Sequence, residues 1–196
     1  MSIACTVIAS TLRSASLTAL CLVALAAASP AQAGVGHGFR AVGGGQRIGH
    51  GAATFRNAQG GITHTHGTRA AGPNGRGAHG AYTSVNPDGS ARHQGATHIA
   101  GARGGNFNGS NSATRNADGS ANGSYQRSGN NAAGGSYSSS GSYARGADGS
   151  ASGARATTVT GANGNTYQGQ TTYTKGEGVT HTGACHDAQG NAISCR

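Results

Sequence analysis

The sequence predicts an all-β protein, an antiparallel meander of about ten strands with about 15 residues from one turn to the next. Three observations lead to this prediction. A four-residue turn signature recurs along the chain, about ten residues lie between consecutive copies, and tyrosines recur at twice the repeat length. Ten residues is an ordinary strand length, so each interval between two turns holds one strand.

The turn signature begins with Asn, Gly or Asp, continues with Ala or Pro and one variable residue, and ends with Gly. Type I turns favour these residue types, and a Gly in the fourth place can form the bulge of a three-residue hairpin connection. The copies begin at Asn57, Gly72, Asn86, Gly101, Asn116, Asn131, Gly146, Gly161 and Asp187, with a degenerate copy at Lys175. Strands are therefore expected from about residue 61 to the C-terminus.

Tyrosines recur at twice the 15-residue spacing of the turns. Tyr137 and Tyr167 are 30 residues apart, as are Tyr143 and Tyr173. Since successive side chains of a strand point to opposite faces, Tyr137, Gly141 and Tyr143 share one face. We interpret these tyrosines as rings that cover strand glycines, an arrangement that stabilises sheets.

Few charges interrupt residues 134–144 and 156–174. Charged residues normally prevent the edge of a sheet from pairing with another molecule. We therefore expect the protein to associate with itself through open edges at these strands.

Residues 1–33 have the pattern of a cleavable signal peptide. Arg13 supplies the positive charge, residues 17–28 form the apolar segment, and Ala31-Gln32-Ala33 offers small residues to a signal peptidase. The apolar segment is shorter than the roughly 20 residues that span a bilayer. We expect a secreted, periplasmic or cell-surface protein with no transmembrane segment after signal cleavage.

The remaining chain has few large apolar residues, because every Leu and the only Met lie in the leader. Such a chain cannot build an ordinary globular core. A β-solenoid with a thin interior of small residues is the alternative architecture, and the composition is also compatible with a largely disordered chain. The hairpin chemistry of the turns favours the meander.

Three regions follow from these patterns: the signal peptide at 1–33, a flexible Gly/His-rich segment at 34–56 without the turn signature, and a Gly/Ser/Thr-rich β-repeat array at 57–196. The array has turns such as Gly72-Pro73-Asn74-Gly75 between Ser/Thr-rich strands, and a tail at 183–191. In these features it resembles secreted glycine-rich β-repeat proteins of Gram-negative bacteria. The resemblance implies an exported repeat architecture and no known activity.

Cys185 and Cys195 flank the last turn and are the only cysteines outside the leader. An even pair this close in an exported chain predicts a disulfide bond. A metal site that includes His186 is the alternative. A three-residue loop would place the two cysteines diagonally, so we expect a wider loop or a bulge to bring them within bonding distance.

Most histidines lie before residue 100. His64 and His66 would place both rings on one face of a strand, a spacing that can chelate zinc, copper or nickel. No third ligand is fixed by the spacing, so a weak metal site and simple solvated histidines are the two interpretations. No cofactor is expected.

The chain has a formal net charge of +9 at pH 7, and such a surface favours carboxylate, sulfate and phosphate partners. For an exported protein these are anionic polysaccharide, lipopolysaccharide and extracellular DNA. Arg56, Arg115 and Arg145 each lie four residues before a turn Gly. They form either a repeated anion-binding stripe or, through edge packing and pairing with Asp118 and Asp148, a structural feature.

We expect no enzyme activity, because most acidic residues occupy turn positions and no catalytic constellation is present. The sequence predicts an exported structural or surface β-repeat protein that self-associates or adheres to anionic polymers in the envelope or matrix. The competing hypothesis is a ligand binder, for metal through the His-rich segment or for a glycan or ice lattice through Thr-x-Thr pairs such as Thr158 and Thr160.

Overall fold

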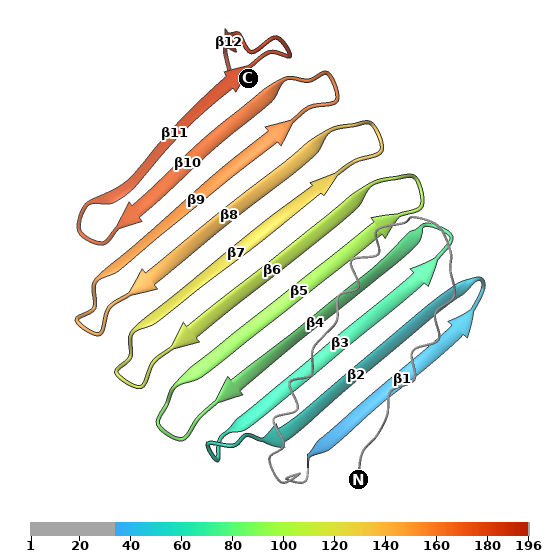
Figure 1. The fold of residues 1–196 in the computed structure, drawn as a ribbon, viewed down its shortest axis with the longest axis vertical. Coiled ribbons are helices and arrows are strands. Elements are labelled where there is room, and N and C mark those ends of the chain that lie inside the picture. Colours follow the sequence, from blue (N-terminus) through green and yellow to red (C-terminus); the bar gives the residue numbers. More distant parts are fainter. Residues whose placement is uncertain (1–33, 196) are drawn as a thin grey trace, which may run out of the picture. The chain divides into compact units, whose positions relative to one another are not determined.

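The computed structural model of the protein describes residues 34–195. The predicted signal peptide, residues 1–33, lies outside them. The described chain forms one sheet of twelve strands, each paired with the next in sequence order (Figure 1). The strands are β1 (Val35–Gly43), β2 (Gln46–Arg56), β3 (Ile62–Gly72), β4 (Gly75–Val85), β5 (Ala91–Gly101), β6 (Asn106–Arg115), β7 (Ala121–Asn130), β8 (Ser136–Arg145), β9 (Ala151–Thr160), β10 (Thr166–Thr174), β11 (Gly178–His186) and β12 (Ala192–Ile193).

The predicted meander is confirmed. Strands β3 to β12 occupy the part of the chain where the turn signature places them, and no crossover interrupts their order. All neighbouring strands are antiparallel. The described residues are therefore neither a solenoid nor a disordered chain.

Most connections have the expected turn geometry. The backbone NH of Gly119 donates to the carbonyl of Asn116 (3.0 Å), and the NH of Asn116 donates to the carbonyl of Ser120 (2.8 Å). Gly119 has a φ of +85°, which residues with a Cβ rarely adopt. The same two bonds close the connections that begin at Asn57, Asn86, Gly101, Asn131, Gly146, Gly161 and Asp187. The connection at Gly72 is shorter, because Gly72 and Gly75 are direct partners.

The expectation of a flexible segment at residues 34–56 is wrong. These residues form β1 and β2, joined by Gly44 and Gly45. Both glycines have positive φ, +56° and +74°, as a two-residue type I′ hairpin turn requires. Such a turn uses Gly-Gly in place of the recurring signature, so a search for the signature overlooks the first hairpin.

Constant turn lengths keep the strands in register. Tyr137 on β8 directly faces Val159 on β9, and Val159 directly faces Tyr167 on β10. We call such a row of direct partners across the sheet a rank. Direct partners lie on the same face of a sheet, so the ranks assign every strand residue to one of two faces.

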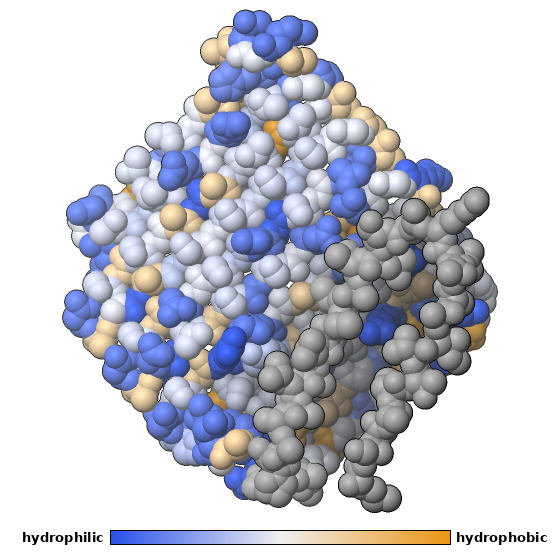
Figure 2. All heavy atoms as spheres, in the orientation of Figure 1, coloured by the Kyte–Doolittle hydropathy of each residue, from blue (hydrophilic) through white to orange (hydrophobic). Residues whose placement is uncertain are grey.

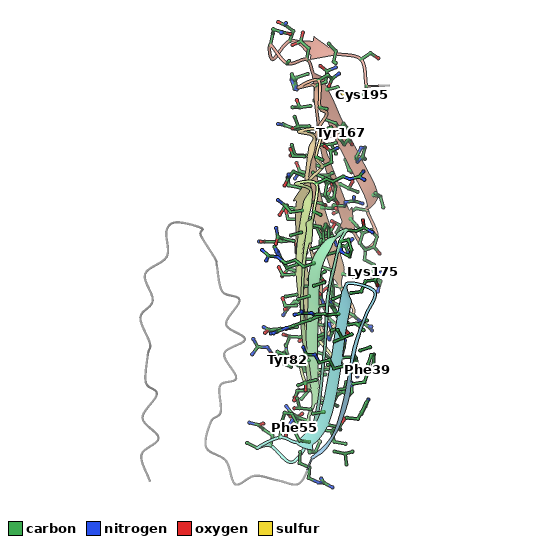
Figure 3. The ribbon with its side chains drawn as sticks, turned by 90° about the vertical axis from the view of Figure 1, so that its right-hand side faces the viewer. Phe39, Phe55, Tyr82, Tyr167, Lys175 and Cys195 are labelled. Atoms are coloured by element: carbon green, nitrogen blue, oxygen red, sulfur yellow. A yellow bond between two sulfur atoms is a disulfide. The ribbon has the colours of Figure 1, made fainter. Side chains whose placement is uncertain are left out.

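We call the face with Phe39 and Tyr167 face A, and the face with Phe55 and Tyr82 face B. Figure 3 shows the two pairs on opposite sides of a single layer of strands. Face A carries almost all bulky residues: Val35, Phe39, Ile48, Ile62, Val85, Ile99, Phe107, Tyr125, Tyr137, Tyr143, Val159, Tyr167, Tyr173, Val179 and Ile193. Face B, which Figure 2 shows, is largely pale where Ser and Thr fill β6 to β10.

Face A is not covered within the described chain. No hydrophobic side chain is buried among residues 34–195. Ile99 is 48% exposed, Tyr143 49% and Val179 69%. A sheet normally buries its apolar face against another layer, and here this face is left to solvent.

The two edges of the sheet differ. Among residues 34–195, β1 is paired on one side only, and β12 covers only Cys185 and His186 of β11. Strands β8 and β10, which carry the recurring tyrosines, are paired on both sides. The expectation of association through open edges at these strands is therefore wrong, because their tyrosines can meet a partner only on face A. None of the described elements is a helix able to cross a membrane.

Candidate functional site

The predicted disulfide is present. Cys185 and Cys195 are bonded, with Cα atoms 5.4 Å apart. No wider loop is needed, because Cys185 directly faces Ile193 across the three-residue connection that starts at Asp187. The chain leaves the ladder after Ile193, which allows Cys195 to reach back to β11. The bond fixes the last hairpin at one edge of the sheet.

His64 and His66 lie on face A, as their spacing predicts, and the fold brings a third ring beside them. The ring centroid of His66 is 5.8 Å from that of His64 and 5.5 Å from that of His79 on β4. His64 and His79 belong to ranks on either side of the rank of His66. A metal ion bound at His66 can therefore take its second ligand from the ring of His64 or of His79. Among the described side chains no group of three or more metal ligands comes together.

Threonines hold most of the histidine rings of face A. In five direct cross-strand pairs, histidine Nδ1 lies 2.8 to 2.9 Å from threonine Oγ1: His50–Thr68, His64–Thr54, His79–Thr97, His93–Thr83 and His181–Thr171. Such a bond orients the ring, and Nε2 is then the other ring nitrogen. In His181, Nε2 lies 3.2 Å from the hydroxyl of Tyr167. His66 instead faces Ala52 and Ala81.

The fold also changes the titration of His66. Partial burial lowers the pKa of His66 below 6.5, and the nearby charges of His79, His64, His50 and His93 lower it further. Gathering imidazoles around His66 therefore disfavours protonation there.

Arg56, Arg115 and Arg145 share one rank of face A, next to the turns. Arg115 and Arg145 lie two strands apart, whereas Val85 and Ile62 lie in the rank between Arg115 and Arg56. Arg56 donates to the carbonyl of Gly60 (3.4 Å). The anion-binding stripe of Arg56, Arg115 and Arg145 stays a prediction. Arg56 on β2 lies four strands from Arg115 on β6, which in turn lies two strands from Arg145 on β8.

The acidic turn residues bond within their own turns. The carboxylate of Asp118 accepts from the hydroxyl of Ser120 (2.7 Å) and from its backbone NH (2.9 Å), and Asp148 is bonded to Ser150 in the same way. These bonds lower the pKa of both carboxyl groups. The aspartates thus act as turn residues, as their positions predict.

A second group of arginines lies on face B, outside the turn-based pattern of Arg56, Arg115 and Arg145. Arg40, Arg47, Arg69 and Arg76 lie on four consecutive strands, β1 to β4, in two adjacent ranks. The signal for this group is a 29-residue internal repeat. Arg40 and Arg69 are separated by 29 residues, as are Arg47 and Arg76.

No family model, no curated protein and no solved structure matches this chain. The resemblance to secreted glycine-rich β-repeat proteins therefore stays a prediction and carries no further argument.

Proposed function

We propose that this protein is an exported structural component of the cell envelope or extracellular matrix that acts in an assembled state. The observation that carries the proposal is the uncovered apolar face A. A chain of this length normally encloses its large side chains, whereas this sheet displays them in ranks on one surface.

A second copy of the chain fits this face by its size. Twelve strands spaced about 4.8 Å apart and about 33 Å long give a face on the order of 1,800 Å². A standard stable interface buries about 800 Å² on each partner. Two sheets that stack through face A would therefore bury ample surface, and packed sheets in ordinary proteins have this same arrangement.

The two ends of face A supply the contacts for stacking. One rank contains Ile99, Phe107, Tyr137 and Val159, and another contains Tyr143, Tyr173 and Val179. Aromatic and β-branched residues at such positions bury large areas at modest entropic cost. The disulfide at Cys185 and Cys195, together with the predicted leader, supports export to an oxidising compartment.

Sedimentation velocity over a concentration series tests the proposal. We expect dimers or larger species at micromolar concentration, and loss of association when Tyr143 and Tyr173 are both replaced by Ser. The matched control replaces Phe55 and Tyr82 of face B by Ser and should leave association intact. A well-folded monomer at every concentration would refute self-assembly, and equal effects of the two variants would refute the role of face A.

A ligand-binding function is the second candidate, favoured by the direct pairing of Thr172 with Thr180 on face B. Flat rows of threonine can match a glycan or ice lattice, and the histidines of face A can bind zinc or copper. Thermal hysteresis, glycan pulldown and metal calorimetry test these alternatives. Negative results in all three would remove them.

A further inference from the structure

Four of the face B arginines form a zigzag across the first four strands. Arg40 and Arg69 share one rank, separated by Gly49, and Arg47 and Arg76 share the next rank, separated by Ala71. Residues two strands apart in a rank are about 9.6 Å apart. Small residues between the arginines leave their side chains room to reach a common ligand.

These arginines are available to a partner. All four are exposed, whereas other arginines are engaged: Arg155 donates to Thr157 (3.2 Å), and Arg127 lies 5.1 Å from the ring centroid of Tyr125. Among the described residues, no hydrogen bond or ion pair holds the guanidinium groups of the zigzag.

The local charge is entirely positive. Within β1 to β5, face B carries no acidic residue. The nearest turns to the zigzag, at 44–45 and 73–74, contain no acid either. Asp88, Asp118, Asp148 and Glu177 lie in turns at the opposite ends of the strands. An anion at the zigzag therefore meets four cations and no competing carboxylate.

The surface beside the zigzag is open and level. Gly38, Gly51, Gly67 and Gly80 form a rank of four glycines on face B, next to the rank of Arg40 and Arg69. A Cβ added at Gly51 would meet no atom within 4 Å. An extended polymer can thus lie across the strands in contact with the backbone, with its charged groups beside the arginines.

We infer that Arg40, Arg47, Arg69 and Arg76 bind an acidic polysaccharide through its carboxylate or sulfate groups. Guanidinium groups recognise these anions with paired hydrogen bonds. A flat face has no element that enters a groove of duplex DNA, and single-stranded nucleic acid needs a series of aromatic platforms. Face B of these strands offers only Phe55 and Tyr82, so polysaccharide is the ligand that the surface fits.

This site rests on the proposed role in the envelope or matrix and adds to it the predicted adhesion to anionic polymers. It lies on the face opposite the tyrosines, so the Tyr143→Ser, Tyr173→Ser variant should bind polysaccharide even where it no longer self-associates. The proposal of self-association and the proposal of polysaccharide binding can therefore be refuted independently.

Calorimetry with the purified disulfide-bonded protein tests the inference, using alginate for carboxylate, dextran sulfate for sulfate, and neutral dextran as a blank. One variant replaces Arg40, Arg47, Arg69 and Arg76 by Gln. A charge-matched control replaces Arg92, Arg127, Arg155 and Lys175 by Gln, four cations that lie outside both the zigzag and the predicted stripe. A third variant replaces the four zigzag arginines by Lys, which keeps the charge and removes the paired donors.

We expect the zigzag Gln variant to lose about tenfold or more in affinity for alginate or dextran sulfate, with a weaker salt dependence. The charge-matched control should change affinity less than about threefold, and the Lys variant should fall between them. Equal losses in the two Gln variants would show binding by net charge alone and overturn the site. Tighter binding to single-stranded DNA than to either polysaccharide would overturn the choice of ligand. Circular dichroism of each variant must show the wild-type β spectrum.

Discussion

The ring of Tyr125 lies over Gly141, its direct partner on the neighbouring strand β8. Arg127 lies 5.1 Å from the centroid of this ring, and the Tyr125 hydroxyl is 3.5 Å from the Ser139 hydroxyl. Of the tyrosines expected to cover glycines, Tyr143 covers Gly123 in the same way and Tyr167 covers Gly169. The ring over Gly141 comes from Tyr125 on the adjacent strand and not from the tyrosines of its own strand.

Replacing Gly141 by Ala should destabilise the sheet by about 1–2 kcal/mol, because the new methyl group meets the Tyr125 ring and overpacking has a cost of this order. The Cβ would also lie 3.0 Å from the carbonyl oxygen of Ala154. Gly51→Ala is the control, since its Cβ meets nothing within 4 Å, and it should be neutral or stabilising by about 0.5 kcal/mol. Thermal unfolding measures both, and equal effects would contradict the role of ring covering.

The disulfide should protect one sheet edge. Replacing Cys195 by Ser removes the link to β11, and β12 then keeps only the pairs at Cys185 and His186. We expect faster amide exchange in β11 and β12, unchanged exchange in β5 to β7, and stronger association through the newly free edge. Hydrogen exchange with mass spectrometry measures the first two results. Uniformly faster exchange across the sheet would show that the bond supports the whole fold.

Acid should weaken the turns through their aspartates. Hydrogen bonds from the side chain and backbone of Ser120 lower the pKa of Asp118 in the folded chain. The folded pKa lies below the unfolded one, so the stabilisation is present above the ordinary aspartate range and is lost as pH falls through the folded pKa. Ser120→Ala should raise the pKa of Asp118 measured by NMR and leave that of Asp148 low. An unchanged value for Asp118 would contradict the role of the hydroxyl.

Much of the fold can be predicted from the sequence because the turns are encoded locally. Asn116 and Gly119 specify a turn by their own conformational preferences, and a constant loop length then fixes the register of every following strand. The turn signature does not predict the first hairpin, because Gly44-Gly45 forms a different turn. Its signal is the 29-residue repeat, in which His37, Arg40 and His50 recur as His66, Arg69 and His79.

The binding surfaces were harder to predict because they depend on the register across several strands. His64 and His66 are neighbours in sequence, so their shared face is evident. His79 joins them only because β3 and β4 connect through two residues in place of three. The same shorter connection places Arg47 and Arg76 in one rank, and no local sequence pattern reveals either arrangement.

His66 provides the last prediction, a loss of stability in mildly acidic solution. Its folded pKa is lowered by partial burial and by the charges of His79, His64, His50 and His93. The unfolded chain therefore takes up the proton more readily, and stability falls as pH decreases from about 6.5 toward the folded pKa. NMR titration should give His66 a pKa below 6.5, and replacing His79 by Gln should raise it. The variant His98→Gln is the control and should leave the titration of His66 unchanged. Equal pKa values for His66 in the wild type and the His79→Gln variant would show that the clustered rings do not interact.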